Sequence, residues 1–182
     1  MARNPRRKTP RPADAIRIYE PVAVTGLFET EDYARALLRP GQRAHRLDRA
    51  VASRMARQEV LRRDEPPWVV VLILEAAIRK IIGSKEITKA QLTSLLDLIS
   101  EPNITVLVVP DDAEVYPAAG FTLFSQAGEP EIGFVESAGG TGRVIELSSK
   151  VEGLRQLWDL IFSAALPDVA SEALIREVME SL

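Results

Sequence analysis

Residues 68–74 read WVVVLIL, an unbroken apolar run that decides the fold of this chain. The run contains three consecutive valines, and it is too short for a typical buried helix. A short apolar run without polar alternation is typical of a strand that is buried on both faces of a sheet. Residues 103–109, NITVLVV, have the same character. The first segment is therefore predicted to be a central strand, and the second another buried strand.

Helical patterns connect these two strands. Residues 75–83, EAAIRKIIG, predict a short helix closed by Gly83, since glycine is common just beyond a helix C-terminus. Thr88 is predicted to cap a second helix. That helix carries apolar side chains at the i, i+3, i+4 and i+7 positions of one face: Leu92, Leu95, Leu96 and Ile99. A strand, a helical crossover and a strand predict a parallel pair with a right-handed connection.

The pattern changes after the second strand. Three short segments, FTLFS, EIGFVE and RVIEL, are separated by turn-rich sequence and predict an antiparallel meander. The glycine-rich SAGGTGR joins two of them and is interpreted as a hairpin, because it lacks the lysine and the following helix of a phosphate-binding loop. Two amphipathic helices, the first over residues 152–166, close the chain. The predicted fold is a mixed α/β (α+β) domain, in which helices flank a central mixed sheet of about five strands.

Upstream of the first central strand, residues 26–38 read GLFETEDYARALL and raise a choice between a helix start and a catalytic carboxylate cluster. Thr30 has the chemistry of an N-cap, and Glu31 lies in the first turn, where the helix dipole favours anions. These features favour capping. Tyr33 belongs to the buried stripe of this helix, and both Tyr33 and Glu31 are candidate ligand-binding residues. Before this helix, residues 14–21 (DAIRIYEP) predict only a short element that stops at its proline.

An arginine-rich helix is predicted from residue 43 to residue 63, with apolar positions such as Leu47 and Val51 on its inward face. Its other faces are rich in arginine, and two interpretations stay open. These side chains either contact phosphates or an acidic partner, or they are solvated and cover apolar surface with their aliphatic stems. Arg54 and Arg57 are therefore candidate ligand-binding residues.

Two residues are candidate catalytic groups. Glu75 directly follows the buried strand, at a place where α/β proteins often carry functional side chains such as a general base. The alternative is that Glu75 caps the next helix and pairs with Arg79. His45 is the only imidazole of the chain and is the other candidate acid–base group, against the alternative of an ordinary surface histidine.

Composition excludes several kinds of site. The chain has 182 residues and no cysteine, so disulfides, thiolate zinc sites and cysteine nucleophiles are absent. A single histidine excludes a histidine-cluster metal site, and no cofactor or metal is expected. No apolar run reaches the roughly 18 residues of a membrane span, which favours a cytoplasmic protein without membrane contact. Residues 1–14, rich in arginine and proline, predict a disordered basic arm, and residues 15–182 a single domain.

Several motifs follow one another in a characteristic order: YEP, GLFETEDYARALL, RMARQEVLRRDEPPWVVVLILEAAIRKIIG, QLTSLLDLI, ITVLVVP, GFTLF and LWDLIFSAALPDVAS. In order and spacing, they resemble the C-terminal domain of unknown function that follows an Xre-type helix-turn-helix in many actinobacterial regulators. The likeness covers residues 15–182. In that family, Pro-Gly-Leu-Leu-Gln-Thr typically precedes Glu-Asp-Tyr-Ala-Arg, whereas here Thr25 replaces the proline, and Phe28 and Glu29 replace Leu-Gln.

The resemblance implies an effector or interaction domain that is commonly encoded beside a small partner protein. Because no helix-turn-helix precedes residue 15, the expectation is a standalone ligand- or partner-binding domain rather than a nucleic-acid-binding regulator, acting with that small protein in natural-product metabolism. The alternative is a biosynthetic enzyme on the same scaffold, for example in antibiotic biosynthesis. It would close a small nitrogen ring such as an aziridine, with loss of an anionic leaving group. Convergence of Glu75, Tyr33, His45 and the arginines on one apolar pocket would favour the enzyme.

Overall fold

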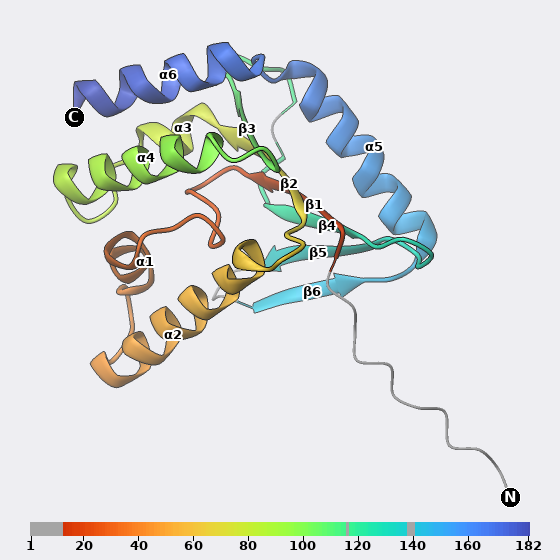
Figure 1. Ribbon diagram of the computed structural model, residues 1–182, viewed down its shortest axis with the longest axis horizontal. Coiled ribbons are helices and arrows are strands. Elements are labelled where there is room, and N and C mark those ends of the chain that lie inside the picture. Colours follow the sequence, from red (N-terminus) through yellow and green to blue (C-terminus); the bar gives the residue numbers. More distant parts are fainter. Residues whose placement is uncertain (1–12, 116, 138–140) are drawn as a thin grey trace, which may run out of the picture.

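The computed structural model describes residues 13–115, 117–137 and 141–182. Its centre is a six-stranded mixed sheet with the strand order β3-β2-β1-β4-β5-β6 (Figure 1). The strands are β1 (Ala15–Glu20), β2 (Trp68–Leu74), β3 (Ile104–Val109), β4 (Phe121–Ser125), β5 (Ile132–Ser137) and β6 (Thr141–Ile145). The first three run parallel, and the last three form an antiparallel meander that joins them through β1. The predicted mixed sheet is confirmed, and it has one strand more than expected. Residues 1–12 of the predicted basic arm lie outside the described residues.

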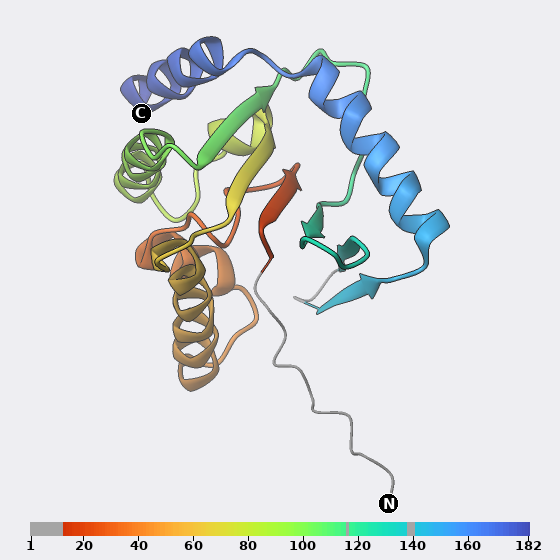
Figure 2. The ribbon, with the colours of Figure 1, turned by 45° about the vertical axis from the view of Figure 1, so that its right-hand side comes forward.

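Helices cover both faces of this sheet. They are α1 (Glu31–Leu38), α2 (Ala44–Arg57), the 3-10 helix η1 (Gln58–Arg62), α3 (Glu75–Arg79), α4 (Lys85–Ile99), α5 (Ser148–Ala164) and α6 (Asp168–Ser181). Figure 1 and Figure 2 show α1, α2, α4 and α6 on one side of the sheet and α5 on the other. The sheet thus separates two cores, one containing Ile16 and Val71 and the other Tyr19 and Leu72. None of the helices in the described ranges has both the length and the hydropathy to cross a membrane.

β1 lies in the middle of the sheet, although its sequence predicted only a short element. It pairs in parallel with β2 on one side and antiparallel with β4 on the other. Its side chains alternate between the two faces, so Ile16 and Ile18 enter one core and Tyr19 the other. Arg17 interrupts the apolar pattern and forms an ion pair with Glu131 at 3.3 Å.

The parallel pair of β2 and β3, connected by helices, is confirmed. The connecting helices differ from the prediction in detail, because α3 ends at Arg79 and α4 is capped by Ser84, whose hydroxyl accepts from the Ile87 N–H at 3.3 Å. The prediction that Thr88 caps this helix is wrong. Thr88 is buried inside α4, and its hydroxyl exchanges two hydrogen bonds with the backbone of Ile82, at 2.9 and 3.2 Å.

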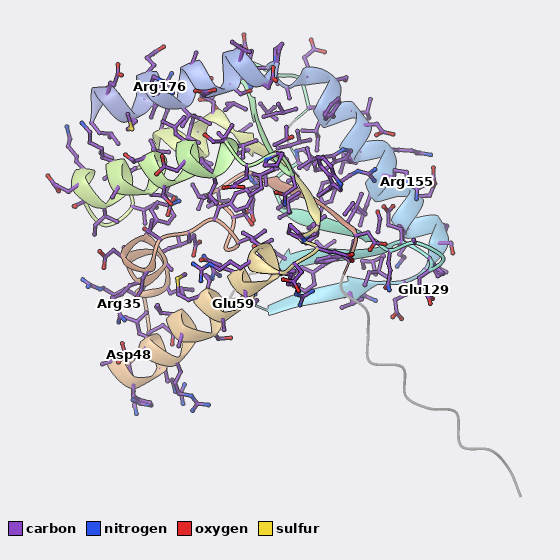
Figure 3. The ribbon with its side chains drawn as sticks, viewed as in Figure 1. Arg35, Asp48, Glu59, Glu129, Arg155 and Arg176 are labelled. Atoms are coloured by element: carbon purple, nitrogen blue, oxygen red, sulfur yellow. The ribbon has the colours of Figure 1, made fainter. Side chains whose placement is uncertain are left out.

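α1 and α2 form a helical hairpin beside the sheet. As predicted, Thr30 caps α1, and its hydroxyl accepts from a backbone N–H of the first turn at 3.4 Å. Arg35 of α1 donates to Asp48 of α2 at 2.5 Å, and Figure 3 shows both on the facing sides of this hairpin. The single helix predicted over residues 43–63 is wrong, because α2 ends at Arg57 and continues as η1. No proline or glycine marks this change of winding, so the sequence pattern contains no sign of it.

The antiparallel meander of β4, β5 and β6 is confirmed. β5 and β6 are antiparallel neighbours whose pairing begins at Ser137 and Thr141, as the hairpin interpretation requires. Residues 138–140, between them, lie outside the described ranges. The helix that follows, α5, begins earlier than the predicted residue 152, and its buried side chains include Trp158 and Ile161.

Candidate functional site

A cavity of about 570 Å³ lies between the sheet and the α1–α2 hairpin. β1, β4 and β5 form its floor, while α1, α2, η1 and the loop after β1 form its other walls. Three floor side chains, Ile18, Thr122 and Phe134, lie in register across the three strands. Further apolar side chains line the walls: Ile16, Val22, Leu37, Leu38, Val60 and Phe124. The cavity is therefore mainly apolar.

Carboxyl groups gather where β1 ends. Glu20 of β1 and Glu136 of β5 line the cavity on either side of Gly120, whose carbonyl accepts from the Glu136 N–H at 3.2 Å. A Cβ atom at Gly120 would lie 3.4 Å from Glu20 Oε2 and 3.0 Å from the Tyr19 carbonyl oxygen. A side chain at this position would therefore crowd the Glu20 carboxyl group and the backbone of Tyr19.

A third carboxyl group, that of Glu29, comes from the loop that follows β1. Its side chain is 0% exposed, and its Oε1 accepts a hydrogen bond from Arg54 Nη1 of α2 at 2.7 Å. The second oxygen, Oε2, is buried without a hydrogen-bond partner among the described residues. Because an unpartnered buried acceptor costs free energy, this atom marks a place where a further donor would bind favourably.

Two glutamines hold the loop that carries Glu29. Gln58 of η1 donates from Nε2 to the Gly26 carbonyl at 3.1 Å and to the Glu29 carbonyl at 2.7 Å. Gln91 of α4, which is fully buried, fastens the same loop through two further backbone hydrogen bonds of 2.7 and 2.8 Å. The loop is thus fixed from two helices, and the position of the Glu29 carboxylate follows from that.

The surroundings of Glu20 and Glu29 disfavour the ionisation of these two acids. Burial raises the pKa of Glu20 to about 8, and the nearby Glu136 carboxylate contributes to this shift. Burial also raises the pKa of Glu29, although the Arg54 guanidinium acts in the opposite direction. Glu20 is therefore largely protonated at neutral pH, and a cationic group in the cavity would help it to ionise.

The structure places two of the predicted ligand-binding residues at this cavity, since Arg54 and Arg57 both line it. Tyr33 is buried beside the cavity loop, where its hydroxyl accepts from the Val24 N–H at 3.4 Å, and burial raises its pKa to about 12. Glu31 lies on the exposed side of α1 and pairs with an arginine of the same helix at 3.2 Å. Of these four candidates, the two arginines thus line the cavity, and Arg54 binds one of its carboxyl groups.

The two candidate catalytic residues lie elsewhere. Glu75 accepts from Arg79 Nε at 2.7 Å and from the Asp111 N–H at 3.3 Å, so the predicted pairing with Arg79 is confirmed. The N-terminus of α3 is capped by Asp111 instead, whose Oδ1 accepts from the Ala76 N–H at 2.8 Å. His45 is exposed at the start of α2. Neither Glu75 nor His45 lines the cavity, and their catalytic roles stay predictions.

Sequence reasoning missed Glu20, Glu29 and Glu136 as site residues. A signal for two of them was present, because strand alternation puts Glu20 on the same face as Ile18, and Glu136 on the same face as Phe134. A carboxyl group on the apolar face of a strand is unusual and can be read from the sequence. Glu29 had no such signal, since a loop without periodicity carries it.

A second hollow, of about 500 Å³, lies on the α5 side of the sheet. Its central acid, Glu131, accepts hydrogen bonds of 3.3, 2.5 and 2.9 Å from Arg17, Ser125 and Arg155. Burial alone would raise the pKa of Glu131, but the hydrogen bonds from Ser125 and Arg155 lower it overall. Both carboxylate oxygens of Glu131 accept hydrogen bonds from the protein itself, so this cluster has a structural role.

Residues 9–177 match a family model described as a domain of unknown function (DUF5753). The match covers nearly the whole chain, including the strands and helices that line the cavity. No curated protein and no solved structure matches the chain.

Proposed function

The chain belongs to the DUF5753 family of domains of unknown function, and we propose that it binds a small, largely apolar molecule in the cavity between the sheet and the α1–α2 hairpin. The size and lining of that cavity carry the proposal. Its volume of about 570 Å³ falls within the range of about 300–1,000 Å³ that is typical of small-molecule sites. Apolar side chains form most of its walls, and a few charged groups at its margin are able to orient a ligand.

Polar contacts keep α2 away from the cavity floor. A pocket of this size persists only where contacts hold its walls apart. The Arg54–Glu29 ion pair and the hydrogen bonds of Gln58 attach α2 and η1 to the loop, and the Arg35–Asp48 pair attaches α2 to α1. These contacts support a site that is already formed before a ligand binds.

Filling the cavity is expected to abolish ligand binding. Thr122 lies in the middle of the floor between Ile18 and Phe134, so Thr122→Trp places an indole ring in the cavity. The neutral dye N-phenyl-1-naphthylamine becomes fluorescent in apolar surroundings, and a fluorescence titration gives its affinity. We expect the unaltered chain to bind it and the variant to bind at least about tenfold more weakly, because the ring occupies the dye's space.

A matched control places the same indole outside the cavity. Thr93 is exposed on α4, and Thr93→Trp is expected to bind the dye as the unaltered chain does. Thermal unfolding of both variants establishes that the sheet is intact. If the unaltered chain fails to bind the dye, or if both tryptophan variants bind it equally well, the proposal is wrong.

A second function, ring closure by an enzyme, is supported by one observation: an acid with a pKa of about 8 and several guanidinium groups line the same cavity. In this proposal, the Glu20 carboxylate removes one proton from a substrate ammonium group. The freed amine forms a C–N bond as the bond from carbon to an oxyanion leaving group breaks, and the anion departs beside Arg57 or Arg63.

Sulfate release from 1-aminoheptan-2-yl sulfate, followed by ion chromatography, tests ring closure. Release is expected with the unaltered chain and not with Glu20→Gln, which has no base at that position. A rate no faster than that in buffer would contradict the enzymatic proposal while leaving ligand binding in place. The small partner protein and the place in natural-product metabolism follow from the resemblance alone and stay predictions.

A further inference from the structure

We propose that the acidic end of the cavity binds the protonated primary amine of an otherwise apolar ligand. The inference rests on the proposed ligand-binding function, because it assigns a chemical class to the ligand of the same cavity. The groups that would receive the amine are the carboxyl groups of Glu20, Glu29 and Glu136, which come from the end of β1, the following loop and β5.

The first argument is the unpartnered oxygen of Glu29. This residue lines the cavity with a side chain that is 0% exposed, and Arg54 binds only its Oε1. Gln58 binds the backbone carbonyl of Glu29 rather than the carboxylate. Oε2 therefore lacks a donor within the described residues, and an N–H group of a ligand would satisfy it.

The second argument is the balance of charge. Within the described residues, no ion pair joins Glu20 or Glu136 to an arginine or a lysine. A cation at this end of the cavity is attracted to the Glu136 carboxylate and favours ionisation of Glu20, whereas an anion there is repelled by Glu136. A primary ammonium group carries three N–H donors, so it can donate to the free oxygen of Glu29 while its charge remains close to the other acids.

The geometry of the site favours an organic cation over a metal ion. Within the described ranges, no group of three or more histidine, cysteine, aspartate or glutamate side chains is placed to hold a metal. Glu20 and Glu136 both line the cavity, and an apolar floor extends from Glu20 back to Ile16. At the rise of a β-strand, that floor is about 13 Å long. A ligand with a cationic head and a medium-length apolar chain would contact both the acidic end and the apolar floor of the cavity.

Isothermal titration calorimetry of the full chain near neutral pH, with three ligands of equal chain length, tests the inference. The ligands are heptan-1-amine, heptan-1-ol and heptanoate, which share the alkyl chain and differ in the charge of the head. We expect the amine to bind at least about tenfold more tightly than the alcohol, and heptanoate to bind most weakly, because charge-assisted hydrogen bonds in a partly buried site exceed neutral ones.

The outcomes separate this inference from the function on which it rests. Equal binding of the amine and the alcohol would overturn the cationic site and leave an apolar ligand site in place. Tighter binding of heptanoate would also overturn it and would assign the cavity to an anion beside its arginines. If none of the three ligands binds and the neutral dye also fails to bind, the ligand-binding function itself is wrong.

Glu136→Gln assigns the effect to the acidic end. Glu136 is exposed, so the isosteric amide removes its charge with little effect on folding, which the thermal midpoint verifies. The advantage of the amine over the alcohol is expected to shrink by about tenfold in this variant. Glu129→Gln removes one charge from the exposed β4–β5 turn, which Figure 3 shows, and should keep that advantage. An equal loss in both variants would overturn the assignment.

Discussion

Replacing Arg54 by methionine is expected to lower the free energy of unfolding by about 3 kcal/mol near neutral pH. Methionine keeps the aliphatic bulk of the side chain but removes the guanidinium group that donates to Glu29 Oε1 at 2.7 Å. The Glu29 side chain is 0% exposed, so its carboxylate would stay buried and would lose its one donor among the described residues. Urea denaturation followed by circular dichroism measures the loss, and it should be smaller at acidic pH, where Glu29 takes up a proton instead.

A double-mutant cycle decides whether the ion pair is the cause. Glu29→Gln removes the buried charge, so the combined variant is expected to regain most of the stability lost by Arg54→Met alone. Arg57→Met is the matched control, because Arg57 lies one turn away on the same helix and is exposed; its effect should stay within about 0.5 kcal/mol. A loss from Arg54→Met that Glu29→Gln does not relieve would show that packing, and not charge, fixes α2 to the loop.

The fold could be predicted where one segment contains its own evidence. Residues 69–74 and 104–109 are buried or partly buried on both faces of the sheet, and an unbroken apolar run is the direct result of that position. β1 lies in the middle of the sheet but could not be recognised in this way. Arg17 interrupts its apolar run, and it is accommodated by Glu131, which lies 114 residues further along the chain. A partner at that distance leaves no mark in a local pattern.

The candidate site could be predicted only in part for the same reason. Arg54 and Arg57 were found because the density of arginine on one helix is visible in the sequence. Whether such an arginine meets water or a buried acid depends on how the helix packs, and the Arg54–Glu29 contact joins residues 25 positions apart. For Glu75 the local position, directly after a buried strand, was predicted correctly, but its place relative to the cavity was not. Its neighbours, including Asp111 at a distance of 36 residues, hold it outside the cavity.

Glu20→Gln is expected to change how stability depends on pH. The pKa of Glu20 is about 8 in the folded chain against an ordinary value of 4.5, chiefly because of burial. Between these two values the folded chain holds a proton that the unfolded chain has released, so the stability of the unaltered chain falls as pH rises from about 4.5 to about 8. Glutamine cannot ionise, so the Glu20→Gln variant lacks this decrease of stability with pH. Since Glu20 is only partly buried, the gain of the variant over that window should be about 2–3 kcal/mol.

Free energies of unfolding from urea denaturation at several pH values across this window test the expectation. The variant should be no more stable than the unaltered chain near the acidic end and clearly more stable near the alkaline end. A shallower slope of the same sign should remain, because burial also raises the pKa of Glu29. Glu129→Gln controls for the loss of one negative charge from the chain.

If the profiles of Glu20→Gln and the unaltered chain run parallel, Glu20 is ionised in the folded chain, and a cationic ligand would meet a carboxylate there without any proton release. If they diverge as expected, titration with heptan-1-amine in buffers of different ionisation enthalpy should register the proton that Glu20 gives up when the ammonium group binds.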